Sequence, residues 1–476
     1  MHKTKYLMIQ DALKKAFSMV FFVVLARYLS ADEFGQYQQL ILVAGLLTMV
    51  FSAGIPVAVS YFYGQSKAYT QKISVFKRFF IFQLLLLFVG SCLLLFFDNQ
   101  LSIKLGNEYI NNLSYLIVIL FVSNSSIEFF KNLSTVTNQL KSYLYLTTTI
   151  QLVSVICSVL VVIINPNIAY ILLTTVIFNS VLFLLLVKKN LKYFLVTIKY
   201  QFMYRVELKY VVAMASVALI GVLNGYVDQL MVSIMLSATE YASLKIGAFQ
   251  IPFISVVTGS LLTVMIPIIS KLFRENQLEE IIETWKLSIE KATILLVPIV
   301  IFCLVFAEEI IIDFFGIKYS PAIIVFQIYM FQWLRAVVIF GGVMGAIGLE
   351  KELFKNTVVI TVLNVVLNYV MILKFGILGA AITTTFLNYF GALLLIKDIN
   401  KRLKRAFFSY FPLRIYFTSL VLSLLISLSL KYLLIGITDS IIGIIFVSMV
   451  FYIVILVIQM KLFYNGFSVQ KLKELI

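Results

Sequence analysis

Long apolar stretches alternate with short polar segments along almost the entire chain. A transmembrane helix needs about 20 consecutive, mostly apolar residues, and fourteen such stretches can be counted. They span residues 10–30, 37–60, 79–97, 111–130, 143–164, 168–187, 210–236, 247–270, 292–314, 322–344, 356–373, 378–396, 411–433 and 438–463. Lys374, Phe375, Gly376 and Gly379 supply the turn between the eleventh and the twelfth. The pattern predicts an all-α polytopic membrane protein with about 14 transmembrane helices.

The composition supports this class and argues against a catalytic site. Hydrophobic residues make up 62% of the 476 residues and charged residues 13%, which is about half the charged share of a soluble domain. The single histidine is His2, and Cys92, Cys157 and Cys303 all lie in apolar stretches. A histidine general base, a metal centre of His and Cys ligands, and a disulfide framework are therefore not expected. We expect no catalytic residue, no cofactor and no enzymatic activity.

Basic residues are distributed unevenly between the two sets of loops that fourteen spans would create. Of the 38 Lys and Arg residues, 31 fall on the side that carries both termini, six fall on the other side, and Arg335 lies within a span. Because cytoplasmic loops are enriched in Lys and Arg, this predicts a multi-pass protein with both termini in the cytoplasm. The same distribution explains the net charge of +16 better than nucleic-acid binding does.

Two short phrases recur at nearly the same separation. Residues 29–34 read LSADEF and residues 236–241 read LSATEY, 207 residues later. Residues 174–179 read TTVIFN and residues 383–388 read TTTFLN, 209 residues later. Matches at one separation that include polar positions indicate an internal duplication.

The duplication predicts the organisation of the chain. Pro56 and Pro267 also correspond, at a separation of 211 residues. Because six helices separate the two copies, the repeats should run parallel, as in some secondary transporters. The predicted parts are an N-terminal six-helix lobe at 1–187, a basic cytoplasmic linker at 188–209, a C-terminal six-helix lobe at 210–397, and two additional helices at 398–476.

Charged residues inside apolar stretches are the main functional candidates, because a charge at the bilayer centre costs about 2.5–3.5 kcal/mol on insertion scales. Arg335 lies near the middle of the tenth span, and Asp228 lies inside the seventh. Arg27 ends the first span, and Lys14 and Lys15 lie just inside it. The four basic residues predict a cationic cavity for an anionic substrate such as a diphosphate. Alternatively, Arg27 extends to the interface and the two lysines anchor the helix.

The end of the first span resembles a known family. Residues 25–37, LARYLSADEFGQY, resemble the A-R-x-L-(G/S)-x-x-E-(F/Y)-G-x-Y phrase of polysaccharide flippases in the multidrug/oligosaccharidyl-lipid/polysaccharide exporter superfamily. Residues 226–229, YVDQ, and 375–381, FGILGAA, resemble two further family phrases. The resemblance implies a V-shaped pair of six-helix lobes with two additional helices. It also implies alternating access that carries undecaprenyl-diphosphate-linked sugars between the leaflets.

The resemblance further implies an ion site in the second lobe. Lipid II flippases of this superfamily hold sodium with an Asp on helix seven, an Asn and an Asp on helix eleven, and a Thr and a backbone carbonyl on helix twelve. The matching positions in this chain are Asp228, Asn364, Asn368, Thr384 and the carbonyl of Ala380. Asn368 replaces the second acid, so sodium and a proton both remain open as the coupling ion. Apart from this sodium, no metal is expected.

The same polar residues also have a purely structural interpretation. In that view, Asp228 accepts hydrogen bonds from Asn224 or from a neighbouring helix. Asn364 and Asn368 stand one helical turn apart, and Thr384 and Asn388 do the same. Hydrogen bonds between packed helices explain such spacings as well as an ion site does.

The sequence as a whole predicts a flippase that supplies lipid-linked oligosaccharides for O-antigen (lipopolysaccharide) or capsule synthesis. The expected location is a bacterial cytoplasmic membrane, and the expected form is a monomer. The expected partners are the bilayer, the lipid-linked substrate, and a polymerase and glycosyltransferases, without nucleic acid. A multidrug/cation antiporter of the same fold is an alternative, favoured by a cavity of the opposite charge. A membrane-embedded polymerase or glycosyltransferase is another, and it would need a large outer loop or clustered acidic residues.

Overall fold

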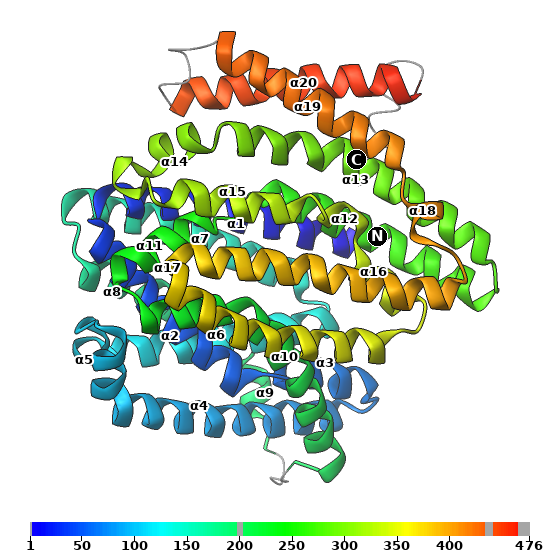
Figure 1. Ribbon diagram of the computed structural model, residues 1–476. Helices are drawn as coiled ribbons and strands as arrows, with labels where there is room; N and C mark the ends of the chain where they lie inside the picture. The colour runs from blue at the N-terminus through cyan, green and yellow to red at the C-terminus, as the bar shows by residue number, and fades with distance from the viewer. Residues whose placement is uncertain (1, 198–202, 434–440, 465–476) are drawn as a thin grey trace. The chain divides into compact units, whose positions relative to one another are not determined.

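The computed structural model describes residues 2–197, 203–433 and 441–464, and these residues form helices and no strand. The chain divides into two compact units, Met1–Ala242 (unit 1) and Ser243–Ile476 (unit 2). Figure 1 labels the helices of both units. The predicted all-α architecture is confirmed.

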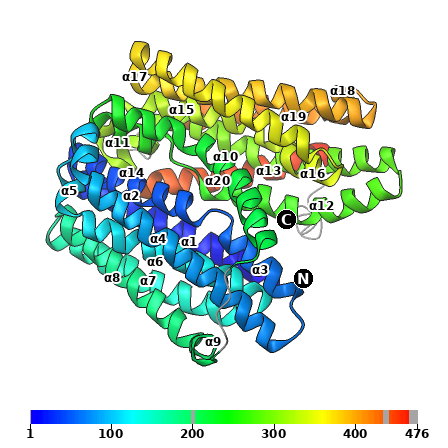
Figure 2. The same ribbon diagram turned by 90° about the horizontal axis from the view of Figure 1, so that it is seen from below.

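Unit 1 is built from packed helices that follow one another with short connections. Figure 2 shows α6, α7 and α8 side by side, and each contacts the other two. The bounds are α1 (His2–Tyr28), α2 (Ala31–Ser52), α3 (Ile55–Gln65), α4 (Tyr69–Leu105), α5 (Tyr109–Asn112), α6 (Ser114–Val136), α7 (Leu140–Ile164), α8 (Ile168–Lys189), α9 (Leu191–Leu195) and α10 (Arg205–Met235). Helix α11 (Ala238–Gly247) begins in unit 1 and ends in unit 2.

Unit 2 is organised around α13, which contacts α12, α15, α19 and α20. In Figure 1, α19 and α20 lie beside α13. The bounds are α12 (Pro252–Arg274), α13 (Leu278–Val305), α14 (Ala307–Phe315), η1 (Ile317–Tyr319), α15 (Ala322–Trp333), η2 (Ala336–Val338), α16 (Phe340–Ala346), α17 (Glu350–Leu403), α18 (Phe407–Tyr410), α19 (Leu413–Leu433) and α20 (Ile441–Tyr464).

Each of the fourteen predicted stretches coincides with one to three of these helices. Among the described residues, eleven helices are long and apolar enough to cross a membrane, or twelve if the two halves of α10, bent by 61°, form one span. The chain is therefore a multi-pass membrane protein. Fourteen spans stay a prediction, although α17 alone holds both the eleventh and the twelfth stretch.

The predicted turn between those two stretches is confirmed. Gly376 has φ 57° and ψ −135°, so α17 consists of two helices joined at this residue. Only glycine adopts this conformation without strain. A Cβ at Gly379 would lie 2.0 Å from the Met371 carbonyl oxygen, so the second helix folds back tightly against the first.

The repeated phrases at 29–34 and 236–241 form the same local structure. Ser30 and Glu33 make reciprocal side chain–backbone hydrogen bonds at the start of α2. Ser237 and Glu240 make the same pair at the start of α11. Both are capping boxes, which satisfy otherwise unpaired amides at a helix N-terminus. The serine and the glutamate of the phrase therefore have a structural role in both copies.

The corresponding prolines do not share a local structure. Pro56 stands in the first turn of α3, directly after the break at Ala53 and Gly54. Pro267 lies inside the continuous helix α12. Proline favours the first turn of a helix because its missing N–H has no partner there in any case. The two sites are thus equivalent in sequence but not in structure.

Helix α10 packs within unit 1, although the sequence analysis assigned it to the second lobe. It contacts α2, α3 and α4. A Cβ at Gly54 would lie 2.4 Å from the Val211 carbonyl oxygen, so only glycine allows this approach. The boundary between the two units falls after Ala242 rather than at the linker. The predicted lobes describe the internal repeat and not the packing of the helices, so the division into two six-helix lobes stays a prediction.

Candidate functional site

Arg335 lies where a predicted single span is broken. Helix α15 ends at Trp333, the short helix η2 follows at Ala336–Val338, and α16 begins at Phe340. Between them, Ile339 has φ 55° and ψ 44°, a left-handed conformation that is rare for a β-branched residue. Strained backbone of this kind concentrates at functional sites. The sequence contains no glycine or proline at 334–339 that would have revealed the break.

The surrounding structure holds the break in place. Trp285 of α13 is fully buried and donates from Nε1 to the Val338 carbonyl oxygen at 2.8 Å. Tyr389 donates to the Phe331 carbonyl oxygen at 2.9 Å, and Tyr416 to that of Leu334 at 3.2 Å. A broken helix leaves carbonyl groups without intrahelical partners. Side chains from α13, α17 and α19 bond carbonyls on both sides of the break.

The guanidinium of Arg335 is held by a neutral group. Its Nη2 donates to Asn388 Oδ1 at 2.6 Å, and Asn388 Nδ2 donates to Gln332 Oε1 at 2.7 Å. The Arg335 Nε atom is buried and has no hydrogen-bond partner in the described part of the chain. Within that part, no carboxylate lies within ion-pair distance of Arg335. The positive charge is therefore compensated by a neutral acceptor rather than by an acidic side chain of the described residues.

A cavity of about 250 Å³ adjoins Arg335 within unit 2. Helices α16, α17, α18 and α19 contribute to its walls. Apart from Arg335, these walls are aliphatic and aromatic, with the hydroxyls of Tyr389 and Tyr416 bonded to backbone carbonyls. One cation in an apolar wall suits a ligand that joins an anionic group to a hydrocarbon chain.

The other predicted substrate residues lie on α1 in unit 1. Lys14 is half-buried, whereas Lys15 and Arg27 are exposed. Neither unit on its own brings these three residues together with Arg335. Their role in substrate binding stays a prediction, and the exposure of Arg27 equally fits the alternative that it extends to the interface.

The predicted ion-site residues are divided between the units. Asp228 is buried in unit 1, on the bent helix α10. In unit 2, Asn364 and Asn368 are buried on one face of α17, and Asn368 Nδ2 donates to Asn364 Oδ1. The two amides therefore share one face, as their spacing predicted, and the Asn368 Oδ1 atom is buried without a partner among the described residues.

The remaining members of that set lie on the second helix of α17. Thr384 is half-buried and Ala380 fully buried. Asn388, one turn after Thr384, bonds Arg335 and Gln332. The side chain of Asn224, the alternative partner of Asp228, falls outside the described residues. The ion site as a whole stays a prediction.

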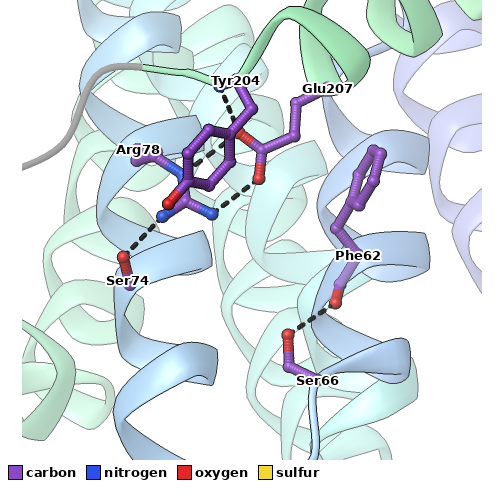
Figure 3. A network of polar contacts seen from close by, with 6 residues as sticks. All are labelled: Phe62, Ser66, Ser74, Arg78, Tyr204 and Glu207. Atoms are coloured by element: carbon purple, nitrogen blue, oxygen red, sulfur yellow. Dashed lines mark hydrogen bonds and ion pairs between the residues drawn. The ribbon is translucent and has the colours of Figure 1, made fainter.

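A polar network in unit 1 was not anticipated (Figure 3). Arg78 Nη2 donates to Glu207 Oε1 at 2.6 Å, and Arg78 Nε donates to Oε2 at 3.1 Å. Arg78 Nη1 donates to Ser74 Oγ at 2.5 Å, and the Tyr204 amide donates to Glu207 Oε2 at 2.9 Å. Both charged side chains are buried. The sequence contains one indication of this ion pair, because Glu207 is the only acidic residue in the basic linker 188–209.

The chain is similar to flippases and transporters of known sequence or structure. It is 28% identical over 167 residues to the probable low-salt glycan biosynthesis flippase Agl15 of Haloferax volcanii, a match that covers 34% of this chain and 35% of that protein. The fold matches the inward closed conformation of the lipid II flippase MurJ with a TM-score of 0.74, at 18% identity and over 96% of this chain and 98% of that one.

A second solved structure extends the comparison. An inward-facing multidrug resistance MATE family transporter of the MOP superfamily matches with a TM-score of 0.59, at 11% identity and over 82% of this chain and 94% of that one. The chain therefore shares its fold with the lipid II flippase MurJ and with this MATE family transporter of the MOP superfamily, as the resemblance implied. The names of these proteins agree with the prediction of a transporter rather than an enzyme.

A family described as "Polysaccharide biosynthesis protein" matches residues 1–273. The match begins at the first residue and ends within the last turn of α12, so it includes the residue 25–37 phrase on which the resemblance was based. Because it covers more than half of the 476 residues, the chain belongs to the polysaccharide biosynthesis protein family.

Proposed function

We propose that this protein is a flippase that moves undecaprenyl-diphosphate-linked oligosaccharides from the inner to the outer leaflet of a bacterial cytoplasmic membrane by alternating access. The product would supply O-antigen or capsule synthesis, with glycosyltransferases and a polymerase as functional partners. No covalent bond is made or broken. The protein would act as a monomer with both termini in the cytoplasm, as the distribution of Lys and Arg predicts.

The observation that carries this proposal is the state of Arg335. Its guanidinium is held by the Asn388 amide on a broken helix, and it adjoins an apolar, aromatic cavity. A guanidinium binds phosphate oxygens through two parallel N–H donors, and such charge-assisted bonds are strong. The apolar walls suit a prenyl chain beside a diphosphate. A substrate of this kind is also what the family description leads us to expect.

The charge of this cavity also separates the proposal from its main alternative. A multidrug/cation antiporter would need a carboxylate facing its ligand, because a cation near an unpaired guanidinium is repelled. The walls of the Arg335 cavity contain no acidic residue. The cavity therefore favours an anionic substrate.

Ion coupling is a separate part of the proposal. Asp228 is buried on a membrane-spanning helix, where an ionised carboxylate needs a cation or hydrogen-bond donors. We expect Asp228, with Asn364, Asn368, Thr384 and the Ala380 carbonyl, to bind sodium or to exchange a proton during transport. Asp228→Asn should then remove the dependence of flipping on the ion gradient, and an unchanged dependence would refute this role.

Proteoliposomes allow a direct test of the main proposal. Vesicles carry undecaprenyl-diphosphate-N-acetylglucosamine, and an impermeant lectin measures how fast the sugar becomes accessible on the opposite face. We expect faster appearance with the protein than in protein-free vesicles, and no effect on efflux of the cation ethidium. Ethidium transport without acceleration of the lipid-linked sugar would instead support the antiporter.

A further inference from the structure

A polar pocket of about 360 Å³ opens in unit 1 where α3 ends and where α4 and α10 begin. It stands out in a chain that is 62% hydrophobic. Its lining residues are mostly polar. They are Gln65, Ser66, Gln71, Ser74, Tyr204, Arg78 and Glu207, with Phe62 and Val75 as the apolar members.

The pocket carries no net charge from its walls. Arg78 and Glu207 are its only charged lining residues, and they bond each other through two parallel hydrogen bonds (Figure 3). A guanidinium neutralised in this way offers little attraction to a phosphate, in contrast to Arg335. The walls therefore favour a neutral ligand that both donates and accepts hydrogen bonds.

The walls are also pre-organised. Ser66 donates to the Phe62 carbonyl oxygen at 2.9 Å, and Gln71 accepts from the Ala68 amide at 3.4 Å. The Tyr204 ring is held over Arg78, with its centroid 4.6 Å from the guanidinium carbon, while 52% of the residue stays exposed. A cation–π contact of this kind fixes the orientation of the ring.

A sugar ring matches this combination of groups. Its hydroxyls donate and accept hydrogen bonds with amides and serine hydroxyls, and its C–H face packs on an aromatic ring. The volume is within the range of about 300–1,000 Å³ found for small-molecule sites. A diphosphate would find no unpaired cation among the lining residues, and a prenyl chain would leave the polar walls unsatisfied.

We propose that this pocket binds a sugar residue of the transported lipid-linked oligosaccharide, with Tyr204 as the stacking ring and Gln65 and Gln71 as hydrogen-bonding groups. The Arg78–Glu207 pair positions Tyr204 and keeps the pocket neutral. The substrate class rests on the proposed function. The predicted orientation puts the linker on the cytoplasmic side, where the sugar would enter.

Free sugars test the pocket without any need for transport. The full chain is placed in lipid nanodiscs, which avoids sugar-based detergents, and saturation-transfer NMR is recorded with methyl glucoside, methyl galactoside and N-acetylglucosamine. We expect transfer to at least one of them, and none to glycerol 3-phosphate. Signal from glycerol 3-phosphate alone, or from no probe, overturns the proposal.

Matched variants locate the binding. The double variant Gln65→Leu/Gln71→Leu should weaken sugar binding by about tenfold or more, because two hydrogen bonds are lost. Gln277→Leu is the control, since Gln277 is an exposed glutamine before a helix of unit 2. Tyr204→Phe should retain the signal and Tyr204→Ala should lose it. Equal binding in all variants contradicts the assignment.

The outcome is separable from that of the proposed function. If the protein binds free sugars in this pocket but does not flip the lipid-linked substrate, the sugar site is supported and the proposed transport function is wrong. If it flips the substrate but gives no sugar signal that depends on Gln65 and Gln71, the transport function is supported and the sugar site is wrong.

Discussion

The two units contain the same polar contact between equivalent helices. In unit 1, Asn179 of α8 donates to Asn124 of α6 at 3.2 Å. In unit 2, Asn388 of α17 donates to Gln332 of α15 at 2.7 Å. The two asparagines are 209 residues apart, and their partners 208. A hydrogen bond kept at both places joins two helices, whichever function the unit has.

The units differ at the residue next to this contact. At the separation of 208 residues that joins Asn124 to Gln332, the counterpart of Arg335 is the apolar Ile127, inside the continuous helix α6. The neighbouring Ser126 hydroxyl is buried, with no hydrogen-bond partner in the described ranges. In unit 2, the charge of Arg335, the helix break and the adjoining cavity occur together. The amide contact is thus common to both units, whereas the charge, the helix break and the cavity accompany it in unit 2, as expected if Arg335 has the proposed role.

The largest effect is expected from removing the charged side chain of Arg335. Arg335→Ala should slow flipping in proteoliposomes by about 10- to 100-fold, the worth of a hydrogen bond to a charged group. Arg335→Lys should retain part of the activity, because lysine keeps the charge without the bidentate fork. Ser126→Ala, a change next to the corresponding contact in unit 1, should flip at the normal rate. If Arg335→Ala also flips the substrate at the normal rate, the proposed role of the Arg335 charge in transport is wrong.

The second largest effect is a loss of stability that should differ between Asn388, which bonds the charged Arg335, and Asn179, which bonds a neutral side chain. Asn388→Leu leaves Arg335 buried without its amide acceptor, and should lower the free energy of unfolding by roughly 3 kcal/mol. Asn179→Leu breaks only a neutral pair and should cost about 1 kcal/mol. Chemical unfolding in detergent measures both. Equal losses would show that Arg335 does not depend on Asn388.

A smaller difference in unfolding free energy is expected between variants at the turns that connect equivalent helices. Gly376 of unit 2 and Asn167 of unit 1 are 209 residues apart. Gly376→Ala forces a side chain into a conformation that favours glycine and should cost roughly 2 kcal/mol of unfolding free energy. Asn167→Ala removes an N-cap that accepts from the Ala169 amide at 2.9 Å, which is worth about 1 kcal/mol. A larger loss for Asn167→Ala would contradict this order.

Much of the fold could be predicted from the sequence, because hydrophobic stretches and turn residues act locally. The turn at Gly376 and the capping boxes at Ser30 and Ser237 follow from the residues themselves. The break at Ile339 could not, because the bonds that hold it come from distant residues such as Trp285. Nothing within the stretch 322–344 indicates where those donors lie.

The candidate site was predictable in part for the same reason. Arg335 was recognisable because a charge inside an apolar stretch is costly wherever it points. Its acceptor Asn388 appeared only as one member of a spacing pattern, and the Arg78–Glu207 pair joins residues 129 positions apart. Pairing across such distances is decided by packing between helices, which one sequence does not encode in any local pattern.

The smallest effect on stability is expected at the residues that follow Asn388 and Asn179. Tyr389 follows Asn388 and donates to the Phe331 carbonyl oxygen at 2.9 Å, whereas Ser180 follows Asn179 and lies 3.5 Å from the Ser123 hydroxyl. The Phe331 carbonyl lies one turn before the break, so its bond to Tyr389 adds support that a continuous helix does not need. Tyr389→Phe should therefore cost about 1 kcal/mol of unfolding free energy.

The matched change Ser180→Ala should cost less than about 0.5 kcal/mol, because a hydrogen bond at the limit of the usual distance contributes little. Tyr389→Phe should also lower the flipping rate slightly, since Arg335 follows Phe331 by one turn and depends on the same break. Ser180→Ala should leave the rate unchanged. If the two variants lose equal stability, the tyrosine does not support the break, and the difference between the units reduces to the charge of Arg335 alone.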